Sequence, residues 1–115
     1  MQFPTQGYGR KALTLLSQSG AVTADLAGGV NYVELWPVGA VTGFGFSNPE
    51  LYAHTVILVI TQDATGGRSV TFNTTQLKLP GGSYTPTATA NGRDVLTFVR
   101  AGALWIENAR SINVS

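Results

Sequence analysis

Few residues in the chain could take part in catalysis. His54 is the single histidine and cysteine is absent, so a serine–histidine–aspartate triad would have to use His54. That histidine directly precedes a β-branched apolar run, where a packing role is expected. A zinc site needs several nitrogen, sulfur or oxygen ligands, which a lone histidine does not supply. We therefore predict that the protein is not an enzyme, with no catalytic residue, no cofactor and no metal.

Two aspartates, Asp63 and Asp94, stand beside glycine-containing turns and close to an arginine. Aspartate in such a position usually accepts hydrogen bonds from turn amides, so a structural role is predicted. The residues assigned to these structural turns are Asp63, Gly66, Gly67, Arg68 and Asp94. None of the six acidic residues lies near another in the sequence. A glycosidase-like pair of carboxylates would therefore have to be assembled by the fold.

The composition narrows the range of partners. The 115 residues carry a net charge of +1 and only 11% of them are charged, whereas an ordinary soluble domain has about 25%. Lysine and arginine are scattered along the chain, which disfavours nucleic acid as a partner. The longest purely apolar run covers residues 56–60, far fewer than the roughly 20 residues of a membrane-spanning helix. We expect neither a nucleic-acid nor a membrane partner.

The hydrophobic pattern predicts strands throughout and no helix. Residues 30–36 alternate between two faces and end at a proline, which cannot donate to a sheet. The β-branched run 55–61 is typical of a strand buried on both faces. Together with 69–73 it predicts one hairpin, and 95–99 with 103–107 predicts a second. We predict an all-β fold, an antiparallel β-sandwich or jelly-roll-like barrel of about seven to eight short strands.

Residues 1–10 contain two glycines and no periodicity, and we predict an extended N-terminal arm there. Residues 11–115 are predicted to form a single β-sandwich domain. The aromatic rings of the arm favour docking on a partner, since a free tail gains nothing from them. The residues expected to contact a partner through the arm are Phe3, Pro4, Tyr8, Arg10 and Lys11.

Aromatic residues in the predicted strands are expected in the core or at a subunit contact. The residues assigned to this role are Trp36, Phe72, Phe98 and Trp105. Tyrosine and phenylalanine in or near loops could instead build a carbohydrate-binding platform or a protein interface, where these residue types are enriched. Their spacing alone does not separate the two.

A set of motifs begins with the apolar run at 55–61 and continues to the second predicted hairpin. After the run come a QDATGGR turn, a VTF strand, an LPGG loop, a DVLTFV strand, and a short turn before a tryptophan strand. As a set, they resemble a β-domain of tailed-bacteriophage virion surface proteins, of the tail-fibre, appendage and capsid-decoration types. The resemblance covers about residues 21–107. It implies a β-sandwich that assembles as a homotrimer on the virion surface and has no catalytic role.

Two virion roles follow from the resemblance. The domain is expected to stand nearly alone, without heptads for a fibre shaft. This favours a homotrimeric capsid decoration or cement subunit, whose arm clamps the major capsid protein or other virion proteins and stabilises the head. The alternative is a tail-fibre or tail-tip module that binds a host-surface receptor, a saccharide, through exposed aromatic and polar side chains. A small glycan hydrolase is a third class, and it would need two carboxylates in one cleft.

Overall fold

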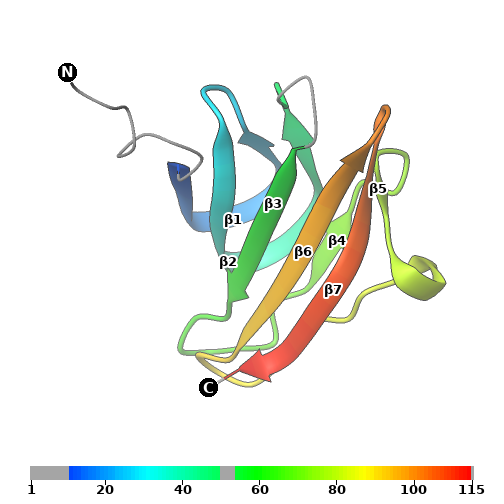
Figure 1. The fold of residues 1–115 in the computed structure, drawn as a ribbon. Coiled ribbons are helices and arrows are strands. Elements are labelled where there is room, and N and C mark those ends of the chain that lie inside the picture. The colour runs from blue at the N-terminus through cyan, green and yellow to red at the C-terminus, as the bar shows by residue number, and fades with distance from the viewer. Residues whose placement is uncertain (1–10, 50–53, 115) are drawn as a thin grey trace.

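The computed structural model describes residues 11–49 and 54–114 (Figure 1). These residues form an all-β fold, which confirms the predicted class. The one helical segment within them is a short 3-10 turn, η2, at Pro80–Gly82. None of the described helical structure is long and apolar enough to cross a membrane. Four residues predicted for the arm lie outside the described part of the chain: Phe3, Pro4, Tyr8 and Arg10.

Seven strands form one mixed sheet that curls into a half-barrel (Figure 1). The order of the strands is β1-β2-β3-β6-β7-β5, and β4 pairs with β2 beside this path. The strands are β1 (Lys11–Asp25), β2 (Val30–Ser47), β3 (Thr55–Thr61), β4 (Val70–Phe72), β5 (Leu77–Lys78), β6 (Arg93–Ala101) and β7 (Leu104–Val114).

The strand directions differ from the prediction of an antiparallel sandwich or jelly roll. Strand β2 pairs in parallel with β1, β3 and β4, and β5 pairs in parallel with β7. The antiparallel pairs of the sheet are β3 with β6 and β6 with β7. The prediction of a wholly antiparallel fold was therefore wrong, because the strands form one mixed, curled sheet with parallel pairs in both halves of the chain.

The short link between β1 and β2, together with their parallel pairing, forces both strands to bend. Only residues 26–29 separate Asp25 from Val30, so the Cα atoms of these two residues lie at most about 18 Å apart. A straight strand as long as β1 would span about 50 Å. Because Lys11 pairs with Val30 and Asp25 pairs with Ser47, both strands must bend back on themselves. The register of β1 on β2 shifts at the bend.

The bent strands lie side by side in the sheet, and each of the two limbs of β2 has its own neighbours (Figure 1). One limb of β2 lies between β1 and β3, and its other limb lies between β1 and β4. The hairpin of β6 and β7 then continues the sheet from β3 in antiparallel fashion. The predicted hairpin of residues 95–99 and 103–107 is confirmed as β6 and β7. The other predicted hairpin, of residues 55–61 and 69–73, is wrong, because β3 pairs with β2 and β6 while β4 pairs in parallel with β2.

The core contains a cluster of aromatic rings inside the curl of the sheet. Phe46 meets Phe98 and Trp105 edge to face, with ring centroids 5.7 and 5.1 Å apart. Phe72 meets Phe98 in the same way at 5.9 Å. Such pairs add about 0.5–1.5 kcal/mol each beyond the area they bury. Trp36 is not part of this cluster and lies half-buried on the outer face of β2.

Two glutamine side chains form hydrogen bonds with the backbone like those that a neighbouring strand would form. The Gln76 side chain accepts a hydrogen bond from the Phe46 N–H at 2.8 Å and donates one to the Phe46 carbonyl at 2.6 Å. Since the Gln76 carbonyl also accepts from the Trp105 N–H at 2.9 Å, this residue links β2 to β7. The buried Gln62 side chain forms the same pair of bonds with the backbone of Arg68, both at 2.9 Å.

The Gln76 clamp can be tested by mutation. We expect Gln76→Ala to lower the free energy of unfolding by about 1–3 kcal/mol, since it leaves the buried backbone groups of Phe46 without partners. Gln76→Glu should be destabilising as well, because a carboxylate cannot donate to the Phe46 carbonyl. Urea denaturation followed by circular dichroism measures both.

The matched control is Gln18→Ala. The Gln18 side chain donates only to the nearby Leu16 carbonyl, so its loss should change the unfolding free energy by less than about 0.5 kcal/mol. Equal losses for the two glutamines would contradict a special role of Gln76 in holding β2 to β7.

Candidate functional site

The outer face of β2 carries a cluster of side chains that is suited to binding. Alternation along the strand sends Val33 and Leu35 into the core and leaves Tyr32, Glu34 and Trp36 half-buried on the other side. Four strand positions separate the two aromatic residues, which places their Cα atoms about 13 Å apart along the strand. The rings therefore stand on either side of the Glu34 carboxylate.

Neighbouring strands complete a groove of about 350 Å³ around this cluster. Val59 stands opposite Glu34 in the sheet register, and Val95 stands opposite Val59. These three side chains, from three adjacent strands, form one row across the groove. The other residues that line it are Tyr32, Trp36, Thr61, Arg93 and Val114.

Glu34 orients both aromatic rings. Its two carboxylate oxygens accept hydrogen bonds from the Tyr32 hydroxyl at 3.1 Å and from the Trp36 indole N–H at 3.4 Å. Burial, followed by the hydrogen bond to Glu34 and its negative charge, raises the pKa of Tyr32 above its ordinary value. The phenol is therefore protonated and donates to Glu34 at neutral pH.

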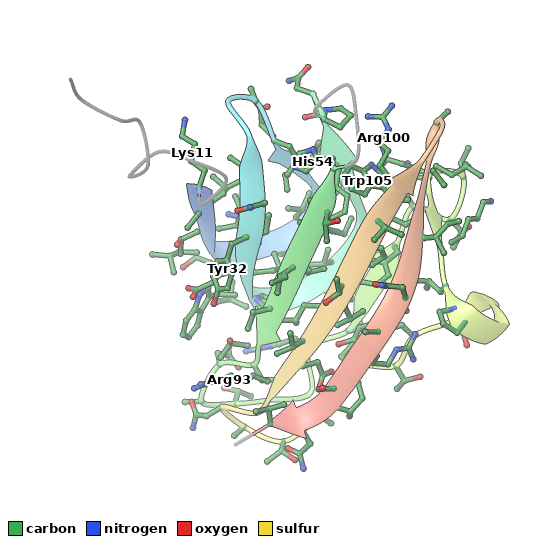
Figure 2. The ribbon with its side chains drawn as sticks, viewed as in Figure 1. Lys11, Tyr32, His54, Arg93, Arg100 and Trp105 are labelled. Atoms are coloured by element: carbon green, nitrogen blue, oxygen red, sulfur yellow. The ribbon has the colours of Figure 1, made fainter. Side chains whose placement is uncertain are left out.

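A second hollow, of about 260 Å³, adjoins the groove on the side of β1. Ala12 pairs with Tyr32 and Tyr32 pairs with Ile57, so one row across three strands lines it. Lys11 and Asn31 lie at its border. Tyr32 lines both hollows, and Figure 2 shows it between Lys11 of the hollow and Arg93 of the groove. We call the hollow and the groove together the strip.

The strip has the features of a ligand-binding site. Ligand sites combine flat apolar surfaces with a few placed polar groups, as the two rings, Glu34 and Arg93 do here. Within residues 11–49 and 54–114, no group of three or more metal-ligating side chains lies together. His54 is buried instead, with Nε2 2.7 Å from the Val30 carbonyl oxygen.

The residues of the predicted turn around Asp63 are not among those that line the groove. Asp63 accepts hydrogen bonds from the N–H groups of Thr65 and Gly66, and Arg68 pairs with it at 2.9 Å. The hydrogen bond from Arg68, followed by that from Gly66, lowers the pKa of Asp63 below its ordinary value. The adjacent Gly67 N–H donates to a carbonyl of the facing loop at 2.9 Å.

Asp94 organises a different region, between the loop before β6 and the end of β7. This buried carboxylate accepts hydrogen bonds from the Tyr84 hydroxyl at 2.5 Å, from the Thr87 hydroxyl and N–H at 2.5 and 2.8 Å, and from the Asn113 N–H at 2.9 Å. Burial by itself raises the pKa of Asp94. The hydrogen bonds from Thr87, Tyr84 and Asn113 outweigh burial and hold the pKa below its ordinary value.

The structure does not gather the residues singled out from sequence into one site. Those buried in the core are Phe72, Phe98 and Trp105, and those in the turn at 63–68 are Asp63, Gly66, Gly67 and Arg68. Sequence reasoning missed Tyr32 and Glu34 as groove residues. Their spacing with Trp36 could have indicated them, because side chains two residues apart in a strand share one face.

The two neighbouring glycines of the turn make a matched pair for a test. Both have positive φ, +76° at Gly66 and +72° at Gly67, so alanine is strained at either position by about 1–2 kcal/mol. A Cβ at Gly66 would also lie 2.5 Å from the Ala88 carbonyl oxygen, whereas none of the surrounding atoms lies within 4 Å of one at Gly67. We expect Gly66→Ala to lose about 1–3 kcal/mol more than Gly67→Ala in thermal or urea unfolding. Equal losses would show that the contact with residues 88–90 is not tight.

The carboxylate of Asp94 should control stability in acid. Since its pKa is lower in the folded protein than its ordinary value, the stability it contributes is present above about pH 4 and is lost as pH falls through the folded pKa. We expect Asp94→Asn to cost about 2–4 kcal/mol at pH 7 and to flatten the decline in stability between pH 4 and lower pH. Urea unfolding at several pH values measures this. Asp25→Asn, at an exposed aspartate, should cost much less, and a similar cost for both would refute the Asp94 network.

Comparison with known proteins identifies the family. A family model described as "Putative phage tail fibre C-terminal domain" matches residues 21–105. No curated protein and no solved structure matches the chain. The family match confirms the resemblance to a virion surface β-domain of phages, and it supports the tail-fibre alternative over the predicted capsid decoration or cement role. Because it spans well over half of the chain, this protein belongs to the family of phage tail fibre C-terminal domains.

Proposed function

We propose that this domain is the receptor-binding part of a tail fibre and that its outer-face groove holds a saccharide of the host surface. The observation that carries the proposal is the placement of Tyr32 and Trp36 on either side of Glu34 over the groove. Aromatic side chains offer a large flat surface with a polar edge, on which the apolar face of a sugar ring can stack. Carboxylate oxygens accept hydrogen bonds from sugar hydroxyls.

Preorganisation supports the same proposal. The hydrogen bonds from Tyr32 and Trp36 to Glu34 hold both rings in place before a ligand arrives. A binding site that is already ordered loses less conformational entropy on binding. A sugar would therefore meet a formed surface.

The groove is suited to binding without hydrolysis. Glu34 is the one acidic side chain among the residues that line it, whereas most glycosidases use a pair of carboxylates on either side of the scissile bond. We propose no catalytic step. The homotrimer and its contacts with other virion proteins stay predictions.

The two tryptophans make the proposal testable by fluorescence. Trp105 is 1% exposed, so a ligand in the groove should change the emission of Trp36 alone. Titration with oligosaccharides from the host surface should give a saturable change. Trp36→Ala should weaken binding about tenfold or more, since aromatic anchors dominate binding energy. Because this variant lacks the fluorescent Trp36, its affinity is measured by calorimetry.

The control is Ile106→Ala, at a side chain that is 42% exposed on β7 and does not line the groove. This variant should bind as the unmodified chain does. Unchanged affinity in Trp36→Ala would overturn the assignment of the groove, and an absence of binding to any surface oligosaccharide would overturn the proposed function itself.

A further inference from the structure

Most cationic side chains that the structure describes have an acceptor within the chain. Their charged nitrogens lie 2.6 to 2.9 Å from carboxylate or carbonyl oxygens. These pairs are Arg68 with Asp63, Arg110 with Glu107, Arg100 with the Gly102 carbonyl and Lys78 with the Thr74 carbonyl. Charges satisfied in this way need no external partner.

Two cations differ from these. Within residues 11–49 and 54–114, neither the Arg93 guanidinium nor the Lys11 ammonium has a hydrogen bond or an ion pair to a described residue. Both side chains are exposed. Arg93 lines the groove and Lys11 borders the adjoining hollow. The two unpaired cations of the described chain therefore both lie on the strip that Tyr32 joins.

The two cations lie at opposite ends of the strip. Figure 2 shows Tyr32 between Lys11 and Arg93. Arg93 and Tyr32 line the same groove. Glu34 lies between the two ends of the strip, with both of its oxygens already engaged by ring donors. The strip thus has positive charge at its ends and negative charge between them.

Resting on the proposed function, we propose that the saccharide is acidic and that its anionic groups meet Arg93 at one end of the strip and Lys11 at the other. The planar guanidinium of Arg93 suits bidentate hydrogen bonds to a carboxylate or a phosphate, and the ammonium of Lys11 serves as a point charge. Tyr32 and Trp36 carry the sugar rings between these ends. The charge of Glu34 disfavours an anionic group at the centre, so the anions belong at the ends of the bound segment.

The test compares three groups of bacterial surface oligosaccharides: neutral, carboxylate-bearing and phosphate-bearing. Binding to the full chain is measured by calorimetry in low and high salt. The carboxylate-bearing sugars are also tested after reduction of their carboxyl groups to alcohols. We expect tight binding to one acidic group, at least tenfold weaker binding to the reduced or neutral form, and a loss of this difference in high salt.

Variants then assign the charges. Arg93→Gln should weaken binding of the acidic sugar about tenfold, and Lys11→Gln should weaken it about threefold, with little change for neutral sugars. The matched controls are Arg100→Gln and Lys78→Gln, which remove cations of the same types away from the strip. These controls should leave the affinity for the acidic sugar unchanged.

The outcomes separate this inference from the proposed function. If neutral and acidic sugars bind equally and Arg93→Gln has no effect, the acidic ligand is wrong while the saccharide groove stands. If the controls weaken binding as much as the strip variants, the attraction is a general charge effect and the inference fails. If no oligosaccharide of any group binds, both proposals fall.

Discussion

A link of four residues between Asp25 and Val30 is the constraint on which the rest of the fold depends. So short a link cannot return the chain across the length of a straight strand. Because β1 and β2 nevertheless pair in parallel, both strands bend back on themselves. Strands β3 and β4 then add to the two limbs of β2. The antiparallel hairpin of β6 and β7 completes the half-barrel and encloses the aromatic core.

The same pairing creates the outer face. Because β2 has neighbours on both sides, its outward side chains stand in rows with those of β1, β3 and β6. Short side chains such as Ala12 and Val59 next to long ones such as Tyr32 and Trp36 produce hollows in these rows. Glu34 then holds the two rings upright through hydrogen bonds. A binding surface therefore arises on regular strands, which hold their side chains more firmly than loops do.

Local patterns predicted much of the fold, and long-range geometry accounts for what they missed. The β-branched run of β3 and the hairpin of β6 and β7 follow from residue types and turns that are close in sequence. Parallel pairing of β1 with β2 has no comparable local signal, since it depends on where each strand bends. The groove was missed for the same reason: alternation places Tyr32, Glu34 and Trp36 on one face, but a sequence does not say whether that face is buried. Trp36 was accordingly assigned to the core or to a subunit contact.

The glutamine clamps have a chemical consequence for a particle that persists outside a cell. Where a sheet is held by main-chain amides, its hydrogen bonds last as long as the chain itself. At Gln76 part of the sheet is held by a side-chain amide, and glutamine is among the residues that are chemically labile with time and heat. Hydrolysis of that amide would put a carboxylate beside the Phe46 carbonyl and loosen β2 from β7. Gln62, at 1% exposure, is shielded from water, so of the two glutamine clamps the one at Gln76 would be lost first.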